Sequence, residues 1–353
     1  MIISNTRHDK RLSFSSLSLH SLFCLLFFLT SCTTEITVEL PTAPRQLVVE
    51  GRIATGTPPV VAISWSQGYF ETIGMESLGA LYRGGAEVWI EVQATGSPDE
   101  PEVRPLLEVC TSDIPPEALP ELAAVLGVPV ELLLTMELCF YTALDWIGET
   151  GHTYTLHAVL DEAEVRAATR LHAPVPLDEV WFEVEHDEIT GTITDSLGFL
   201  HATLTDPDTL GNAYRWGAQR LNLSPEGSPF AGQPLDSEIL YPLGSVTDDR
   251  MFNGVTFEFW YYRADSPENA DMDSTSSTGS HNLTGYFKVG DTVSVEWSHI
   301  DLGVFRAIDS YELQLASQAN PFASPADLKS NVEGGLGIWA GYSTTYDTVI
   351  CTR

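Results

Sequence analysis

The stretch Ala86-Glu87-Val88-Trp89-Ile90-Glu91-Val92 places Val88, Ile90 and Val92 on one face of an extended backbone and both glutamates on the other. Alternation of this kind is typical of a β-strand with one buried and one solvated face. Segments 153–159 (Thr-Tyr-Thr-Leu-His-Ala-Val) and 292–297 (Thr-Val-Ser-Val-Glu-Trp) repeat the pattern. Because such strands recur along most of the chain, we predict a mostly β protein with two β-sandwich-like domains.

A proline-rich segment separates the two predicted domains. Ala173-Pro174-Val175-Pro176 favours a stiff, extended connector, so we place the linker at residues 173–178. The N-terminal domain, residues 45–172, is expected to be an immunoglobulin-like β-sandwich. The C-terminal domain, residues 179–353, is expected to be β-rich with one helix.

That helix is predicted near residues 302–317. An apolar stripe at helical spacing consists of Val304, Phe305, Ile308, Tyr311 and Leu315. Asp301 precedes the stripe and is a suitable N-cap residue. We expect the helix to pack on the sheets of the C-terminal domain.

A small helical hairpin is predicted as an insert at residues 110–139 of the first domain. Residues 116–126 have helical spacing and end at a glycine, and a second helix is expected over residues 130–138. Cys110 and Cys139 bracket the insert, and two interpretations stay open, a disulfide in an oxidising compartment or two separate buried thiols. The last cysteine, Cys351, is expected to lie in a final strand.

The N-terminus has the features of a lipoprotein signal. Arg7, Lys10 and Arg11 precede the apolar run 22–29, and Leu29-Thr30-Ser31-Cys32 follows the lipobox pattern. We predict a signal peptide at residues 1–31, a diacylglyceryl group on Cys32 with further acylation of the new amine, and a tether at residues 32–44. The alternative is an ordinary signal peptide with a chance cysteine. Several acyl chains hold a protein firmly to a membrane.

The charge balance excludes some classes of partner. The chain carries 49 acidic and 17 basic residues, for a formal net charge of -32. Such a surface repels nucleic acid and anionic lipid headgroups. The acidic residues are scattered along the chain, which favours solubility in a saline habitat over the capture of divalent cations.

Motifs for catalysis, metals or cofactors do not stand out. The histidines form no His-x-His or His-Glu-x-x-His pair, and the sequence contains no Gly-x-Ser-x-Gly elbow. We therefore expect a protein that is not an enzyme, with no metal and no cofactor. A hydrolase is the less favoured alternative.

Aromatic residues supply the candidate binding surface. Trp260-Tyr261-Tyr262 lies in an expected strand, in which consecutive side chains point to opposite faces. We predict that part of this cluster lines a surface for a ligand or partner. The alternative, that all three rings are core, is the commoner fate of strand aromatics.

An ordered set of motifs resembles a known family. The matching segments are Leu40-Pro41 with Leu47-Val48-Val49-Glu50-Gly51-Arg52-Ile53, Gly85-Ala86-Glu87-Val88, Gly151-His152-Thr153-Tyr154-Thr155-Leu156, Asp206-Pro207 with Gly211-Asn212-Ala213-Tyr214-Arg215, Phe252-Asn253-Gly254, and Asn320-Pro321-Phe322 followed by Ser330-Asn331-Val332-Glu333-Gly334-Gly335-Leu336-Gly337-Ile338. Together they resemble the domain-of-unknown-function 4249 lipoproteins over essentially all of the mature chain. The sequence departs from the family pattern at His152, Ala213 and Trp339.

The resemblance implies a location and a role. Members of that family are outer-membrane lipoproteins, often encoded beside TonB-dependent transporters, and no enzymatic activity is established for them. We therefore expect a non-catalytic lipoprotein of the outer membrane that is an accessory or ligand-capture partner of a TonB-dependent barrel. The alternative is a structural or adhesive cell-surface module. The sequence leaves open the ligand and whether the protein faces the periplasm or the cell surface.

Overall fold

The computed structural model describes residues 44–68, 84–120, 123, 130–135, 138–184, 196–224, 226–227, 231–264, 285–317 and 327–353. The predicted signal peptide, Cys32 and the tether up to residue 43 lie outside the described residues, as does the Asn320-Pro321-Phe322 motif. The predicted fold class is confirmed, because the structure is mostly β with several sheets and a C-terminal helix. Among the described residues, no helix combines the length and the apolar character needed to cross a membrane.

The first sandwich packs two layers of strands around one core. One layer has the order β16 (Val332–Glu333), β8 (Ala163–Leu171), β7 (His152–Leu160), β3 (Glu87–Ala94) and β4 (Glu102–Pro105). The facing strands are β1 (Leu47–Ala54), β2 (Val60–Trp65), β6 (Cys139–Thr142) and β5 (Leu107–Cys110). Val88 and Ile90 of β3 are buried in this core, as their alternation predicts, together with Trp339.

The second sandwich has its own core. Its outer layer contains β9 (Glu179–Val184), β10 (Leu197–Thr205), β13 (Thr256–Tyr261) and β14 (Phe287–Lys288). The facing strands are β11 (Ala213–Arg220), β12 (Val246–Asp248) with the 3-10 turn η3 (Asp249–Met251), and β15 (Thr292–Ile300). Leu200, Trp216 and Trp297 are buried between the layers.

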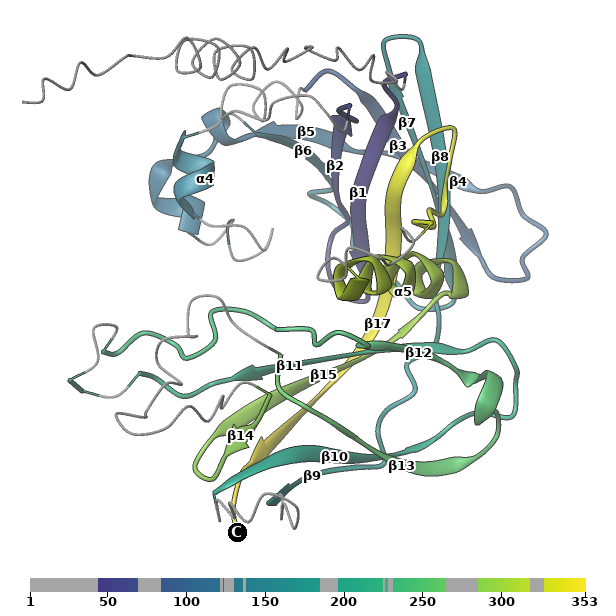
Figure 1. The fold of residues 1–353 in the computed structure, drawn as a ribbon. Helices are drawn as coiled ribbons and strands as arrows, with labels where there is room; N and C mark the ends of the chain where they lie inside the picture. The colour runs from purple at the N-terminus through teal and green to yellow at the C-terminus, as the bar shows by residue number, and fades with distance from the viewer. Residues whose placement is uncertain are drawn as a thin grey trace, which may run out of the picture. The chain divides into compact units, whose positions relative to one another are not determined.

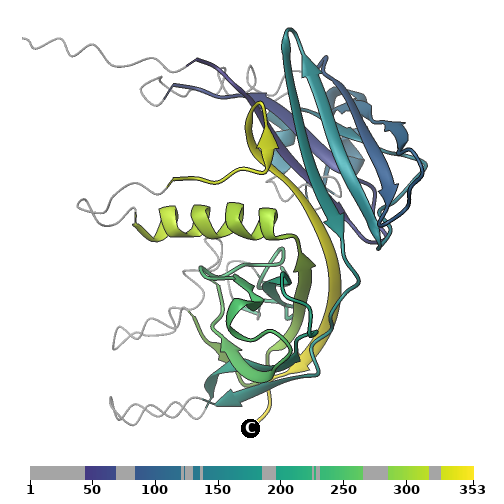
Figure 2. The same cartoon turned by 90° about the vertical axis from the view of Figure 1, so that its right-hand side faces the viewer.

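A single strand joins the two sandwiches. The first half of β17 (Leu336–Ile350) pairs in parallel with β1, from Val48 opposite Leu336 to Ala54 opposite Tyr342. The second half pairs antiparallel with β15, from His299 opposite Ser343 to Thr292 opposite Ile350. One eight-stranded sheet therefore contributes a layer to both sandwiches. Figures 1 and 2 show β17 in yellow continuing from one sandwich into the other.

This pairing differs from the predicted domain limits at one point. Residues 332–342 belong to the C-terminal domain in the sequence prediction, but β16 pairs with β8 and the start of β17 pairs with β1. The local sequence of residues 336–350 carries no information about which strands lie beside it. The linker at residues 173–178 stays a prediction.

Helix α5 (Leu302–Ser317) matches the predicted range. Val304, Phe305 and Ile308 are buried against Ile300 and Ala340 of the shared sheet. The prediction that Tyr311 continues this buried stripe is wrong, because its side chain is 55% exposed. The carbonyl of Asp301 accepts the first helical hydrogen bond, from the Phe305 N–H at 2.9 Å.

The insert between the two cysteines is only partly helical in the described residues. It contains the 3-10 turns η1 (Thr111–Asp113) and η2 (Pro116–Ala118) and the helix α4 (Val130–Thr135). Leu119 and Leu133 pack in a small core of their own. Cys110 and Cys139 lie directly opposite each other on β5 and β6 and form a disulfide. Cys351 is buried just after β17.

Candidate functional site

The structure separates the three aromatic residues predicted as a binding cluster. Trp260 points away from the core of the second sandwich and is 54% exposed. Tyr261 points inward and stacks on Trp216, with ring centroids 4.7 Å apart. Burial raises the pKa of Tyr261 above its usual value. Tyr262 lies beyond the end of β13 and donates a hydrogen bond to the carbonyl of Leu243.

Trp260 belongs to a row of rings on the outside of the second sandwich. His201 of β10 lies opposite Trp181 of β9 on one side and opposite Trp260 of β13 on the other. Phe199 packs against Trp260 with centroids 4.7 Å apart and against Tyr286 with centroids 4.9 Å apart. We call this surface, made of Trp181, Phe199, His201, Trp260 and Tyr286, the outer aromatic face.

The strand alternation explains why these rings share a face. In β10, Leu200, Ala202 and Leu204 fill the core, so Phe199 and His201 point outward. In β13, the inward residues likewise alternate with Trp260 and Glu258. Directly opposite residues of antiparallel strands point to the same side of a sheet, which brings Trp181, His201 and Trp260 into line.

Two carboxylates flank the centre of this face. Nδ1 of His201 lies 3.3 Å from Oε1 of Glu258, and its Nε2 lies 3.9 Å from Oε2 of Glu183. The side chains of Glu183 and Glu258 are 63% and 60% exposed, whereas that of His201 is 16% exposed. The face thus combines apolar rings with carboxylate acceptors that are open to a ligand.

Sequence reasoning found Trp260 but not its neighbours. The alternation of β9 and β10 is visible in the sequence and places Trp181 and His201 on one face of each strand. It does not give the register between strands, which alone brings these rings beside Trp260. Trp216 and Trp297 are core residues of the second sandwich, with 0% and 2% exposure.

Tyr262 lines a separate hollow. A cavity of about 470 Å³ lies between Tyr241, Leu243, Tyr262 and Arg263. The hydroxyl of Tyr241 donates a hydrogen bond to Glu296 at 2.8 Å. The guanidinium of Arg215 lies 3.6 Å from the centroid of the Tyr241 ring. The sequence-predicted residues Trp260 and Tyr262 therefore belong to two different surfaces.

A second, smaller hollow lies at one end of the first sandwich. It measures about 190 Å³ and is lined by Glu102, Arg104, Glu149 and His152 among others. Arg104 pairs with Glu102 at 2.8 Å and lies 5.2 Å from the centroid of the Trp146 ring. The guanidinium of Arg104 therefore already has an ion-pair partner and a cation–π partner.

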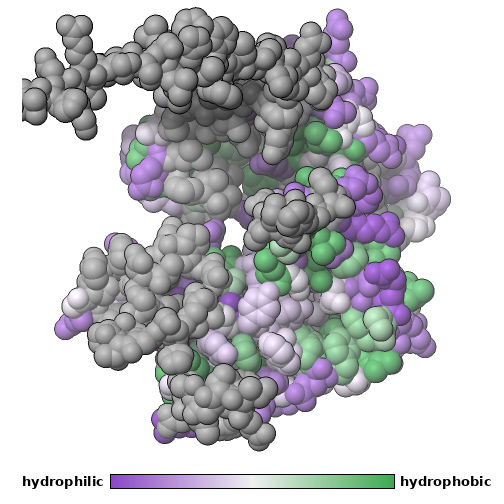
Figure 3. Space-filling view, viewed as in Figure 1, coloured by the Kyte–Doolittle hydropathy of each residue, from purple (hydrophilic) through white to green (hydrophobic). Residues whose placement is uncertain are grey.

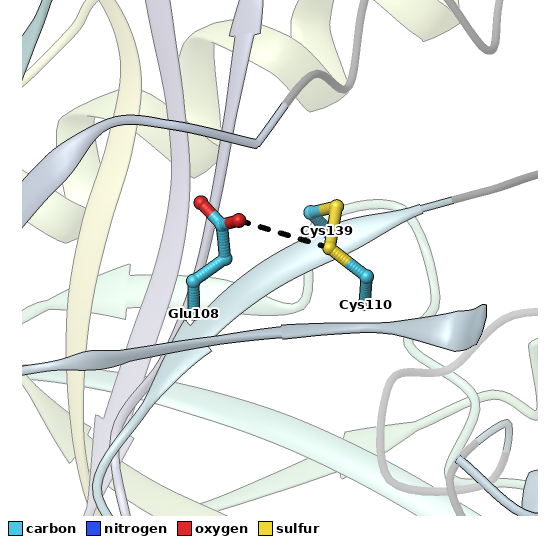
Figure 4. Close-up of side chains that lie close together, drawn as sticks. All are labelled: Glu108, Cys110 and Cys139. Atoms are coloured by element: carbon cyan, nitrogen blue, oxygen red, sulfur yellow. Dashed lines mark hydrogen bonds between the residues drawn. A yellow bond between two sulfur atoms is a disulfide. The ribbon is translucent and has the colours of Figure 1, made fainter. Parts of the chain in front are cut away.

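One group of acidic and sulfur side chains resembles a metal-ligand set. Glu108 lies beside Cys110 and Cys139, with one carboxylate oxygen 3.8 Å from the sulfur of Cys110 (Figure 4). Both sulfurs are consumed in the disulfide, so neither offers the thiolate that a metal would need. Glu108 instead accepts hydrogen bonds from the Tyr141 hydroxyl at 2.8 Å and the Gly85 N–H at 2.5 Å. It therefore connects β5 to β6 and to the segment that precedes β3.

Some apolar side chains outside the outer aromatic face are also exposed, among them Leu144 (76%) and Met251 (95%). On the face shown in Figure 3, hydrophobic side chains lie among hydrophilic ones over the described surface. Single exposed apolar residues are normal on soluble domains and indicate no site. The predicted lipidation site Cys32 lies outside the described residues.

Comparisons with known proteins add little. No family model matches the chain. No curated protein matches it. Among solved structures, it has a distant likeness to a cycloalternan-degrading enzyme from Trueperella pyogenes in complex with cycloalternan, with 10% sequence identity and a TM-score of 0.21. That match spans 84% of this chain and 34% of the other chain, and a TM-score this low supports no conclusion about fold or function.

Proposed function

We propose that this chain is a non-catalytic lipoprotein of the outer membrane that captures a ligand on its outer aromatic face for a TonB-dependent transporter. The lipobox at Cys32 and the resemblance to the domain-of-unknown-function 4249 lipoproteins support the location and the partner. The geometry of the second sandwich supports the binding role. The protein binds and releases this ligand without changing it chemically.

The exposed indole of Trp260 is the observation that carries the binding role. A large aromatic ring exposes apolar area that is favourably removed from water by a ligand, at about 25 cal/mol per Å². Trp260 is 54% exposed although Phe199 packs on it. Because the ring sits on a strand and against a neighbour, little conformational entropy is lost when a ligand binds.

The predicted anchor and tether support a role beside a membrane partner. Residues 32–44 would link the acylated cysteine to β1, which begins at Leu47. A short tether keeps the binding face at high effective concentration next to other proteins of the same membrane. A ligand bound there is released close to the barrel that takes it up.

The location is tested by replacing the cysteine of the lipobox. Cys32→Ser should abolish incorporation of labelled palmitate and leave an uncleaved signal, whereas Cys24→Ser, within the apolar run of the signal, should behave as the parent chain. Fractionation of the envelope and mass spectrometry of the N-terminus give both readouts. Lipid incorporation into the Cys32→Ser variant would contradict the proposal.

The partner is tested by purification from solubilised outer membranes. A TonB-dependent barrel should co-purify with the full lipidated chain. Loss of cell adhesion or of surface integrity on deletion, with no barrel recovered, would instead support the structural or adhesive alternative and overturn the transporter role.

A further inference from the structure

The arrangement of the rings on the outer aromatic face restricts what it can bind. The interplanar angles are 26° for Trp181 and His201, 28° for Phe199 and Tyr286, and 34° for Phe199 and Trp260. Rings that recognise a quaternary ammonium group surround it as a cage. These rings instead stack against one another along the sheet. In this apolar strip the rings cover faces of their neighbours, so a flat ligand with an apolar side finds an uncovered ring face at an end of the strip.

Trp260 gives this strip an open end. Among the described strands, β13 pairs with β10 alone, so Trp260 stands at an edge of its sheet. Phe199 packs on the indole from β10, and the exposed 54% of the residue is available beyond it. A ring stacked there would be in contact with the indole and with water at once, as tryptophan commonly is in binding surfaces.

The polar groups beside Trp260 are acceptors. Glu258 lies two residues before Trp260 on the same face of β13, and its exposed carboxylate has room for donors besides His201. Glu183 on the far side of His201 is similarly exposed. With a net charge of -32 on the chain, these carboxylates disfavour an anionic ligand. The matching ligand has an apolar ring face, several hydroxyl donors and no negative charge.

We infer that the ligand captured by the outer aromatic face is a neutral carbohydrate. One pyranose ring stacks through its C–H side on the indole of Trp260, and its hydroxyls donate to Glu258. His201 holds that carboxylate in place from β10. This inference rests on the proposed capture function and names its ligand class.

Isothermal titration of the full-length protein tests the inference. The protein is kept in a polyoxyethylene detergent, because detergents with sugar headgroups would compete, and is titrated with neutral oligosaccharides of glucose, mannose, xylose and galactose. At least one should bind saturably, with an affinity that changes little between low and high salt. Trp260→Ala should weaken it about tenfold or more, as expected for a central aromatic contact.

Matched variants separate binding from folding. Trp260→Phe should recover part of the affinity, and Glu258→Gln should weaken it severalfold while leaving the melting temperature unchanged. Tyr311→Ala, on the 55% exposed ring of α5, should bind as the parent chain does. Failure of all the oligosaccharides to bind, equal binding by Trp260→Ala, or salt-sensitive binding of tetramethylammonium in their place would overturn the inference. If the barrel still co-purifies in that case, the ligand class fails and the transporter role stands.

Discussion

Nε2 of His172 lies 2.5 Å from Oδ1 of Asp301, and this pair links the end of the first sandwich to the start of α5. The other carboxylate oxygen accepts hydrogen bonds from the Arg170 N–H at 2.5 Å and the Thr169 hydroxyl at 3.2 Å. One carboxylate therefore receives three donors from the end of β8 and from the residue just after it. The carboxylate of Asp301 and strand β17 thus connect the two sandwiches, and we call this connection the joint.

Removing this carboxylate should loosen the joint. Asp301→Ala leaves the three donors without their acceptor, so we expect the free energy of unfolding to fall by about 1–3 kcal/mol. Chemical denaturation of the full chain measures the loss. The control is Asp327→Asn, because Asp327 pairs with Lys329 on the surface, where such pairs contribute little. Equal stability of the two variants would contradict a structural role for Asp301.

His299 should make the stability of the joint depend on pH. Its Nδ1 donates to the Ala173 carbonyl at 2.9 Å, and its buried Nε2 has no partner within the described part of the chain. Burial lowers the pKa of His299 below its usual value near 6.5. The unfolded chain therefore takes up the proton first, and this contribution to stability is full above about pH 6.5 and is lost as the pH falls through the lower, folded pKa.

Denaturation at a series of pH values checks this. His299→Asn keeps a donor for the Ala173 carbonyl and removes the titrating group, so the decline in unfolding free energy between about pH 7 and pH 5 should become shallower. An identical pH profile in the variant would show that His299 is not responsible.

Gly337 should tolerate no side chain. Its φ is +104°, and a Cβ built there would lie 1.9 Å from the carbonyl oxygen of Val49 on the neighbouring strand β1. We expect Gly337→Ala to cost more than about 1 kcal/mol of unfolding free energy, because both the backbone conformation and the strand spacing oppose it. Gly56→Ala is the comparison, since Gly56 has a φ of +81° but no atom within 4 Å of its Cβ position. A thermal melt that ranks the two variants in the opposite order would contradict the close approach of β1 and β17.

The disulfide should stabilise the first sandwich. Cys110 and Cys139 close a loop with a sequence separation of 29 residues, which corresponds to about 3–4 kcal/mol in the chain-entropy account. The double variant Cys110→Ala with Cys139→Ala should therefore have a lower melting temperature than the parent chain. A reductant should lower the melting temperature of the parent chain and leave that of the double variant unchanged. Unchanged melting in both cases would show that the bond contributes nothing to the fold.

Local patterns in the sequence predicted the elements well. The alternating segments 153–159 and 292–297 fall in β7 and β15, segment 86–92 lies in β3 from Glu87 onward, and the helix at residues 302–317 is α5. Each of these depends on the side chains of a few neighbouring residues, which alternation and helical spacing report directly. The expectation that Tyr311 is buried is wrong. A stripe at helical spacing predicts which face of a helix is apolar, but not how far along the helix that face is covered by the sheet.

Strand partners could not be predicted in the same way. That β17 begins beside β1 and ends beside β15 is a property of pairings distant in sequence. The residues of β17 do not by themselves specify these two partners. The outer aromatic face has the same origin. Trp260 could be proposed from its own strand, but Trp181 and His201 reach it only through the register of three strands.

Hydroxyl-radical footprinting of the full chain with the neutral oligosaccharides tests the central claim most directly. Trp260 and Tyr311 are 54% and 55% exposed, so in the free protein both should be oxidised. We predict that a bound oligosaccharide protects Trp260 and leaves the oxidation of Tyr311 unchanged. Equal oxidation of Trp260 with and without saturating ligand would contradict capture on this face.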